Sequence, residues 1–428
     1  MRFQFVWVGL VFGGLLIGQA SPEPGQALPQ TVTLDQAIQE ALAKNLDLAA
    51  EKWNVTIAEA REITAHLRPN PVLTVSGQTL NVLGATYSPN TPLGPNQMNI
   101  HTDIPFERAN KRERRVELAK ELKSSAELGV REVMRQVIFS VQSAFVDVQQ
   151  AKNNLALAQE NLRNLEGVVT VNEARLNSGD LAQVELERSR VAAYQYRTAV
   201  QQAELQLDQT KIQLQFLMGR LQRSPDFDTA GDLRRDVLLE TPVEIATKAL
   251  SFRPDYLGGT QSQVRSQADL RLQLANGKVD YVIGTEYTRQ QAWGVSGSSM
   301  GVYFSMPLPI FNKNQGEIAR AEREIALAGA RRTALEASIN VEVERAYQQY
   351  AVSRRVLADL EANMLTKARS VRDTTEYSYR RGEATLVEFL DAQRAFNDAM
   401  QTFNDARANF ARSLYLIDTV SGATVSGN

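Results

Sequence analysis

The sequence predicts a mainly α-helical protein with a small β part, in which long coiled-coil-like helical hairpins carry four strands per chain. Three observations lead to this fold class. Residues 106–224 and 310–428 contain none of the 14 prolines and are rich in helix-forming residues. Four other segments alternate apolar and polar residues with a period of two. Similar features recur about 205 residues apart, which indicates an internal duplication.

The N-terminal segment has the features of a secretory signal peptide. Arg2 precedes an apolar run from Phe3 to Ile17, and Gly18 and Ala20 supply the small residues of a cleavage site. We expect this segment to be removed; an uncleaved anchor is the alternative. The sequence has no cysteine, so we expect no lipoprotein attachment.

Composition excludes several classes of function. Lys and Arg number 47 against 49 Asp and Glu, which leaves no basic excess for nucleic acid. The two histidines, His66 and His101, lack the spacing of a metal-ligand set. No phosphate-binding loop, nucleophile elbow or dinucleotide motif occurs. We therefore expect a protein that is not an enzyme, with no catalytic residue, no cofactor and no metal site.

Each proline-free stretch is predicted to form a long hairpin that turns at a glycine. Gly179 and Gly382 stand in polar, turn-like sequences. Helices of this length need partner helices beside them. A shorter helix from Leu34 to Leu67 opens the first repeat. Its length and that of the helix after Gly179 add up to the long helix, so we expect the two to stack end to end.

The alternating segments are predicted to be membrane-spanning strands. Their length of about nine to eleven residues is that of tilted barrel strands. Four strands cannot close a barrel, and an open edge cannot lie in lipid, so chains must assemble. Two chains would supply eight strands and three would supply twelve; a soluble sheet with helical arms is the alternative. The strands are expected near 72–80, 97–105, 279–289 and 300–308, with loops at 81–95 and 290–299.

The expected organisation has four parts. They are a signal peptide at 1–20, a first repeat at 31–224 with its turn at Gly179, a linker at 225–241, and a second repeat at 242–422 with its turn at Gly382.

In their order and spacing, these features resemble the TolC-type outer membrane factor family, the outer membrane efflux proteins. The marks are "TLDQAIQEALAKNLDL" and "RPNP" before the first strand, and "IPFERANKRERR" and "LPIFNKNQGEIARAE" at the start of the long helices. The resemblance covers about Thr31 to Gly422 and is greatest to the branch that serves RND-type and heavy-metal pumps. It implies a homotrimer with one twelve-stranded outer-membrane β-barrel and one periplasmic α-helical tunnel.

The resemblance also implies a function and partners. The trimer would lie in the cell outer membrane, in contact with its lipid, with a large periplasmic portion. It would be the exit duct of a tripartite efflux system and conduct small toxic solutes, drugs or metal cations, passively. A periplasmic adaptor protein and an inner-membrane RND-type pump would supply the cargo. The alternatives are the exit of a type I protein secretion system driven by an ABC transporter, or a periplasmic coiled-coil scaffold without a pore.

An entrance gate is implied at the second turn. By resemblance, Tyr379 is a gate tyrosine, and Glu388 and Asp391 ring the constriction. Three copies of two carboxylates would favour cations over anions. The bland alternative is that both carboxylates lie on a solvated helix face. Ala384 stands where the family's best-known member has an arginine, so a closing salt bridge from that position is absent; Arg381 or Arg188 is the candidate substitute.

The two turns resemble the tips at which the adaptor docks, although the glycines also have a purely geometric role because they permit positive φ. A basic cluster follows the second strand, where lipid head groups or phosphates would lie; a solvated helix start is the alternative. The docking residues are Arg175, Leu176, Gly179 and Leu181 in the first turn and Arg381, Gly382 and Leu386 in the second. The basic cluster is Arg108, Lys111, Arg112, Arg114 and Arg115.

Overall fold

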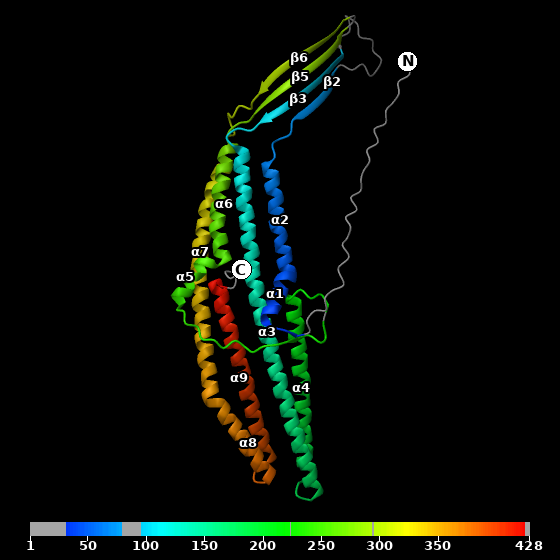
Figure 1. Cartoon of the computed structure of the whole chain (residues 1–428), viewed down its shortest axis with the longest axis vertical. Helices are drawn as coiled ribbons and strands as arrows, with labels where there is room; N and C mark the ends of the chain where they lie inside the picture. The colour runs from blue at the N-terminus through cyan, green and yellow to red at the C-terminus, as the bar shows by residue number, and fades with distance from the viewer. Residues whose placement is uncertain (1–30, 79–95, 223, 293–294, 424–428) are drawn as a thin grey trace, which may run out of the picture.

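The computed structural model describes residues 31–78, 96–222, 224–292 and 295–423. The chain is elongated, with a four-stranded sheet at one end and two helical turns at the other (Figure 1). It is mainly α-helical with a small β part, which confirms the predicted fold class. The predicted signal peptide lies outside the described residues.

The first half of the chain contains helices α1 to α4. Their bounds are Leu34–Lys44 for α1, Leu46–His66 for α2, Lys111–Asn177 for α3 and Gln183–Leu217 for α4. The expectation of one helix from Leu34 to Leu67 is wrong, because Asn45 interrupts it. Asn45 has an extended ψ of 131°, and its side chain accepts a hydrogen bond from the Leu48 amide to cap α2. Its Nδ2 also donates to the Leu217 carbonyl at 2.9 Å, which ties this break to the end of α4.

The second half repeats this order with one difference in its long helix. The helices are α5 (Pro242–Phe252), α6 (Pro254–Asn276), α7 (Gln315–Asp359), α8 (Leu365–Arg381) and α9 (Leu386–Ser421). A π-helical turn, Leu360–Met364, separates α7 from α8.

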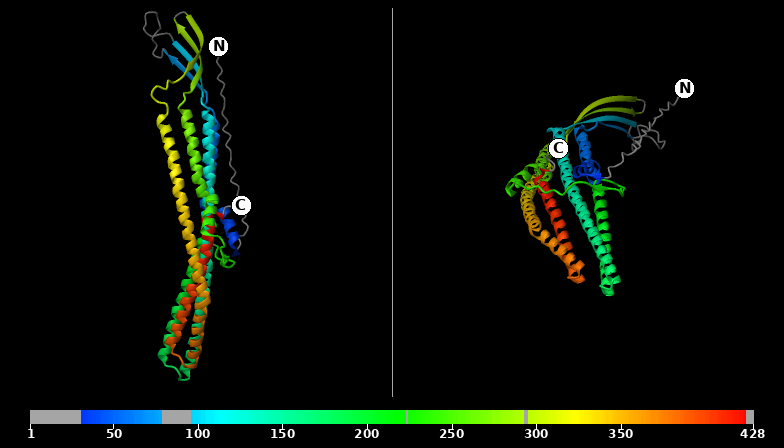
Figure 2. Two further views of the ribbon diagram at one scale, coloured as in Figure 1. Left: turned by 90° about the vertical axis from the view of Figure 1, so that its left-hand side faces the viewer. Right: turned by 60° about the horizontal axis from the view of Figure 1, so that its bottom comes forward.

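The helices form two rows that share α3. Near the sheet the row is α7, α6, α3, α2, and near the turns it is α8, α9, α3, α4 (Figures 1 and 2). Thus α2 and α4 follow one another along α3, while α6 and α9 follow one another alongside α7. Small residues such as Ala346, Ala406 and Ala411 are buried where the helices meet, which allows close packing.

The sheet has the order β2-β3-β5-β6 and is antiparallel throughout. The expected loop at 290–299 is too long, because Ser296 to Ser299 continue the ladder despite their turn-like composition. The strand expected at 300–308 ends at Ser305, before the prolines at 307 and 309, which cannot donate to a ladder. The strands are β2 (Val72–Gln78), β3 (Asn96–Phe106), β5 (Tyr281–Ala292) and β6 (Val295–Ser305).

The two faces of the sheet differ in polarity. On one face, Val75, Ile100 and Tyr287 lie side by side in register; on the other, Thr74, His101 and Glu286 do so. The apolar face is largely exposed, with Val302 at 77% and Phe304 at 63%. Such a face needs an apolar environment or a partner.

A pair of short strands at mid-height ties the segment between the two halves to the first half. β1 (Thr31–Val32) pairs in parallel with β4 (Asp228–Thr229) of the segment that links α4 to α5. Val32 and Phe227 are fully buried there against α3 and α4. Among the helices that the structure describes, none has a stretch long and apolar enough to cross a membrane.

Candidate gate at the two helical turns

The first turn is shaped by Gly179. Its φ of +85° lies in the left-handed region that side chains disfavour. This conformation lets the Gly179 amide donate to the Leu176 carbonyl at 3.0 Å and the Asp180 amide to the Arg175 carbonyl at 2.8 Å, which satisfies the end of α3. The α4 helix then begins after Ala182 without a side-chain cap.

The second turn has the same glycine geometry and a stronger helix start. Gly382 has a φ of +80°, and its amide donates to the Tyr379 carbonyl at 3.0 Å. Thr385 caps α9: its hydroxyl accepts from the Glu388 amide, while the Glu388 carboxylate accepts from the Thr385 amide at 2.7 Å. This reciprocal pair is a capping box.

Tyr379 links the two hairpins. Only 2% of its surface is exposed, and its hydroxyl donates to Asn172 Oδ1 of α3 at 2.7 Å. Its ring stacks on Phe389 of α9 with centroids 5.4 Å apart. Burial raises the pKa of Tyr379, so the hydroxyl stays protonated at neutral pH and remains a donor.

The two acidic residues of the expected gate are exposed. The hydrogen bond from the Thr385 backbone lowers the pKa of Glu388, which is therefore a carboxylate at neutral pH. Asp391 lies 3.4 Å from Arg394 on the same helix, in a pair that solvent screens. Among the described residues, the hydrogen bonds and ion pairs of both carboxylates stay within the second hairpin.

The expected docking residues divide between surface and interior. Leu386 is buried in the cluster around Tyr379, while Gly179 and Gly382 are exposed at the turns. Arg175, Leu176 and Leu181 are half-buried at the first turn. Arg381 is exposed and lies over the Tyr377 ring at 4.6 Å.

The salt bridge that an arginine at position 384 would make has no substitute among the described residues. Within the described part of the chain, neither Arg381 nor Arg188 makes an ion pair across the hairpins. Ala384 itself packs beside the buried cluster of Tyr379. The contact between the hairpins at this level combines the neutral Tyr379–Asn172 hydrogen bond, apolar packing, and the Arg175 guanidinium 6.0 Å from the centroid of the Tyr379 ring.

Above Tyr379, amide side chains continue the link between α3 or α4 and α9. Gln393 Nε2 donates to Asn161 Oδ1 at 2.9 Å in a buried contact. Asn404 pairs with Asn154 at 2.8 Å, and Asn397 donates to the Tyr196 hydroxyl at 3.1 Å. We call these three contacts, with Tyr379–Asn172, the polar seam. Its signal in the sequence is polar residues at helical spacing within an apolar stripe, and the polar seam was not predicted from it.

A shallow groove lies beside the polar seam, between α4 and α9. It measures about 350 Å³, and Val184, Val191 and Val387 line it with more than half of each side chain exposed. Arg188, Arg394 and the acidic Glu187 also line it.

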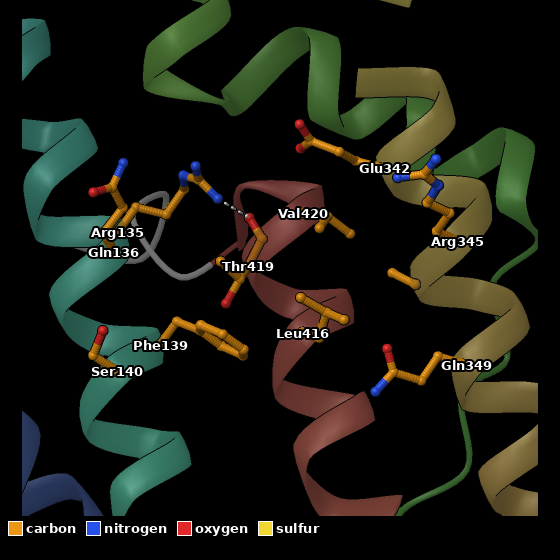
Figure 3. A pocket seen from close by; sticks show the side chains of 11 residues that line it. Arg135, Gln136, Phe139, Ser140, Glu342, Arg345, Gln349, Leu416, Thr419 and Val420 are labelled. Atoms are coloured by element: carbon orange, nitrogen blue, oxygen red, sulfur yellow. Dashed lines mark hydrogen bonds between the residues drawn. The ribbon is translucent and has the colours of Figure 1, made fainter. Parts of the chain in front are cut away.

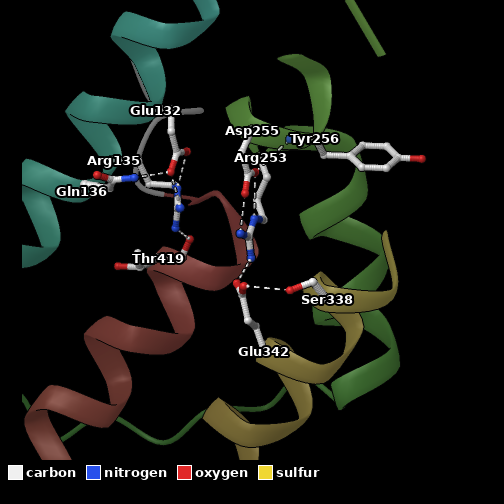
Figure 4. A network of polar contacts seen from close by, with 9 residues as sticks. All are labelled: Glu132, Arg135, Gln136, Arg253, Asp255, Tyr256, Ser338, Glu342 and Thr419. Carbon is white, nitrogen blue, oxygen red and sulfur yellow. Dashed lines mark hydrogen bonds and ion pairs between the residues drawn. The ribbon is translucent and has the colours of Figure 1, made fainter. Parts of the chain in front are cut away.

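A second hollow of about 460 Å³ lies at mid-height between α3, α7 and α9 (Figure 3). Beside it, two arginines make polar contacts between neighbouring helices (Figure 4). Arg135 donates to the Thr419 carbonyl at 3.1 Å, and Arg253 bridges Asp255 and Glu342 at 2.6 and 2.7 Å. These guanidinium groups are occupied by the carboxylates and the carbonyl of the fold, so this site is structural.

Neither histidine belongs to a metal-ligand set in the structure. His66 lies 4.0 Å from Glu62, and His101 lies 3.8 Å from Asp103. Among the residues described, no group of three or more His, Cys, Asp or Glu side chains is placed to hold a metal ion.

This architecture is that of a known class of protein. The family described as "Outer membrane efflux protein" matches residues 37–220 and 260–423, which is most of the chain. The chain therefore belongs to the outer membrane efflux protein family, a family of efflux proteins rather than of enzymes.

Individual members of the family resemble this chain over most or part of its length. The cobalt-zinc-cadmium resistance protein CzcC of Cupriavidus metallidurans is 26% identical over 85% of this chain and 83% of its own. The pyoverdine export outer membrane protein OpmQ of Pseudomonas putida is 28% identical over 62% and 57%. The solved structure of CusC superposes with a TM-score of 0.74 at 19% identity, over 94% of this chain and 97% of that one, and so shares its fold.

Proposed function

We propose that three copies of this chain form an exit duct in the cell outer membrane. The observation that carries this proposal is the four-stranded sheet, which has an exposed apolar face and two open edges, β2 and β6, among the described strands. If β6 of each copy pairs with β2 of the next, three copies close a twelve-stranded barrel whose apolar face meets lipid. The helices then form a periplasmic tunnel of roughly 100 Å, the length of α3 at 1.5 Å per residue.

The two repeats, 31–224 and 242–422, would each supply two strands and one hairpin to this assembly, with 225–241 as the linker between them. The β1–β4 pair is consistent with this division, because β4 belongs to the segment between the repeats and packs on the first one.

The proposed cargo is a small toxic solute, with metal cations as the first class to test. The names of CzcC, a cobalt-zinc-cadmium resistance protein, and OpmQ, a pyoverdine exporter, both describe small solutes. Exposed Glu388 and Asp391 would place six carboxylates near the entrance of a trimer, which favours cations. We propose that conduction is passive and that energy comes from an inner-membrane RND-type pump acting through a periplasmic adaptor.

Opening would separate the second hairpin from the first along the polar seam. Two buried atoms of the seam, Asn172 Nδ2 and Gln393 Oε1, have no hydrogen-bond partner among the described residues. Water would satisfy both on separation, which lowers the free-energy cost of opening. Tyr379 is proposed as the main latch, and the residues of the two turns as the adaptor contact.

Crosslinking at the first turn tests the partner. The sequence has no cysteine, so Leu181→Cys introduces a single thiol. An RND-type adaptor captured in living cells would support the efflux proposal. Capture of an ABC-type adaptor would instead move the function to protein secretion, which is the second candidate. Leu205→Cys, on an exposed part of α4 away from the turn, is the matched control and should capture less.

Conductance tests the duct itself. The purified protein, reconstituted in a planar bilayer, should give discrete conductance steps with cation selectivity. Glu388→Gln with Asp391→Asn should shift the reversal potential toward zero in a salt gradient. A protein that stays soluble without detergent and gives no steps would be a scaffold without a pore.

A further inference from the structure

A hollow lies where the sheet meets the helices. It measures about 610 Å³ and is bordered by the link from α2 to β2 on one side and the link from β3 to α3 on the other. Residues 68–71 form the first border, and residues 104–107 and 109–113 form the second. In Figure 1 this place is the junction between the lower end of β2 and β3 and the upper ends of α2 and α3.

One wall of the hollow is apolar and continuous with the apolar face of the sheet. Ile104 and Phe106 belong to that face and are 41% and 40% exposed. Phe106 stacks on Tyr281 at 5.3 Å, and Tyr281 lies 5.6 Å from Phe304. Aromatic side chains in a band at the end of membrane strands are typical of the boundary between lipid tails and head groups.

Another part of the lining is cationic. Arg68 and Arg112 line the hollow, and Arg108 is adjacent. Within the described part of the chain, Arg68 and Arg108 make no ion pair, and Arg112 has only the exposed Glu113 at 3.0 Å.

The other acidic side chain of the hollow is neutralised within the fold. Arg115 donates to both oxygens of Glu107, with Nη2 to Oε2 at 2.9 Å. Lys111 is buried and donates to Asp280 at 2.7 Å. The charge that remains available to a ligand is therefore positive and comes from arginine.

We propose that this hollow binds the head group of an anionic glycerophospholipid from the periplasmic leaflet of the outer membrane. Arg68 and Arg112 would hold the phosphate, because guanidinium groups match phosphate oxygens in a two-pronged geometry. An acyl chain would lie against Ile104 and Phe106. The site rests on the proposed function, since only a chain in the membrane presents this wall to lipid.

A lipid fits this hollow better than a soluble anion does. A free phosphate would use the arginines and leave the exposed Ile104 and Phe106 in water. A phospholipid covers the apolar and the cationic part of the lining at once, which is the combination found at a membrane boundary. The bound lipid would fix the depth of the barrel where β3 continues into α3.

Native mass spectrometry of the assembled, delipidated protein tests the site. The probe is 1-palmitoyl-2-oleoyl phosphatidylglycerol, compared with phosphatidylcholine of the same chains and with glycerol phosphate as a soluble competitor. We expect phosphatidylglycerol to be retained, and Arg68→Gln with Arg112→Gln to weaken retention at least fivefold. Arg354→Gln, an exposed arginine of α7, is the matched control and should have no effect.

Three results would overturn the site: no phosphatidylglycerol retained by the wild type, equal retention by the double variant, or displacement by glycerol phosphate at concentrations similar to those of the lipid. Arg68→Lys with Arg112→Lys keeps both charges and should retain most of the binding. If the double glutamine variant does not assemble, Arg68→Gln alone gives the same test, because this side chain makes no ion pair within the described part of the chain.

Conductance in phosphatidylcholine bilayers separates this inference from the proposed function. A channel that conducts but retains no phosphatidylglycerol refutes the lipid site and leaves the duct standing. A protein that gives no conductance steps and does not enter bilayers refutes the duct and the lipid site together.

Discussion

The two helical hairpins share an order of elements but differ in their long helices. In the first, α3 runs without a break for 67 residues from the sheet to the turn. In the second, the same distance is divided into α7 of 45 residues, a π-helical turn of five and α8 of 17. π-Helical turns are uncommon and are frequently found at functional sites. The second hairpin therefore has a joint that the first lacks.

The helix starts after the two turns differ as well, and here the second hairpin has the more strongly capped helix. The α9 helix starts with a complete capping box at Thr385, whereas α4 starts after Ala182 with no side-chain cap. The part of the second hairpin between the π-helical turn and Gly382 therefore carries Tyr379 and is followed by a fully capped helix. We therefore propose that, on opening, the second hairpin bends at this π-helical turn while the first hairpin stays in place.

Removal of the latch should have the largest effect. Tyr379→Ala deletes a buried ring and its hydrogen bond to Asn172, at a cost of about 3 to 5 kcal/mol, the range for large aromatic side chains in cores. We expect a higher open probability in bilayers and a lower Tm. Tyr377→Ala changes the same residue type two positions away at an exposed site and should alter both by far less. Equal effects of the two would refute the latch.

Tyr379→Phe isolates the hydroxyl. It should cost about 1 kcal/mol, the net value of one hydrogen bond. Because burial raises the pKa of Tyr379, the wild type keeps its full contribution below about pH 10 and loses it as the pH rises through the folded-state pKa. Titration of tyrosinate absorbance in both proteins measures this. If the Tyr379 hydroxyl ionised at the ordinary tyrosine pKa, the claim that it is buried would be refuted.

Removal of the π-helical turn between α7 and α8 should change the open probability of the channel more than the stability of the fold. Deletion of Ala362, an exposed residue of the π-helical turn, would convert the turn to a regular helix and leave α8 in register with its neighbours. We expect the channel to open less often with Tm little changed, whereas Ala362→Leu keeps the residue count and should open normally. Unchanged gating after the deletion would remove the joint from the mechanism.

Substitutions at the N-caps of α9 and α4 should change the free energy of unfolding by about 1 kcal/mol or less. Thr385→Ala should destabilise α9 by about 1 kcal/mol, and Ala182→Ser should stabilise α4 by a fraction of that. The lowered pKa of Glu388 means that its contribution is present above its unfolded pKa near 4.5 and is lost as the pH falls through its folded-state value. Melting curves between pH 3 and 7 should show this loss in the wild type and not in Glu388→Gln.

Substitutions of glycines inside the long helices should have the smallest effects on stability. A Cβ on Gly167 in α3 or Gly329 in α7 would meet no atom within 4 Å. Each change to alanine should stabilise the chain by up to about 1 kcal/mol. A Cβ on Gly129 would lie 2.9 Å from Glu51 Oε1, so Gly129→Ala should gain less. Thermal melts of the three variants test the order.

Some local features could be predicted from the sequence because their signals are local. Gly179 and Gly382 stand in polar turn sequences, and both adopt positive φ. The alternation in Asn96–Phe106 is continuous, so this strand could be recognised from its period. The strand at Val295–Ser305 was partly missed because Val295 is followed by Ser and Gly, which join the ladder only through pairing with β5. The break at Asn45 was missed because it depends on the contact with Leu217 at the end of α4.

The residues of the candidate gate also divide into those with a local sequence signal and those without one. Tyr379 could be named from its motif, but its partner Asn172 could not, since the two lie on different hairpins and meet only through packing. Glu388 carries a local signal as the third residue of a capping box after Thr385. Its role at a gate and the adaptor-docking roles of the two turns stay predictions.

By itself, the sequence determined the class of fold, the glycine turns and the alternating strands, because helix propensity, positive φ and side-chain period act over a few residues. Only the tertiary structure decided which polar residues form the seam, where a π-helical turn interrupts the second long helix, and which arginines beside the sheet have no ion-pair partner among the described residues. These depend on contacts between segments up to about 250 residues apart, such as Asn154 with Asn404, and no local pattern encodes such pairings.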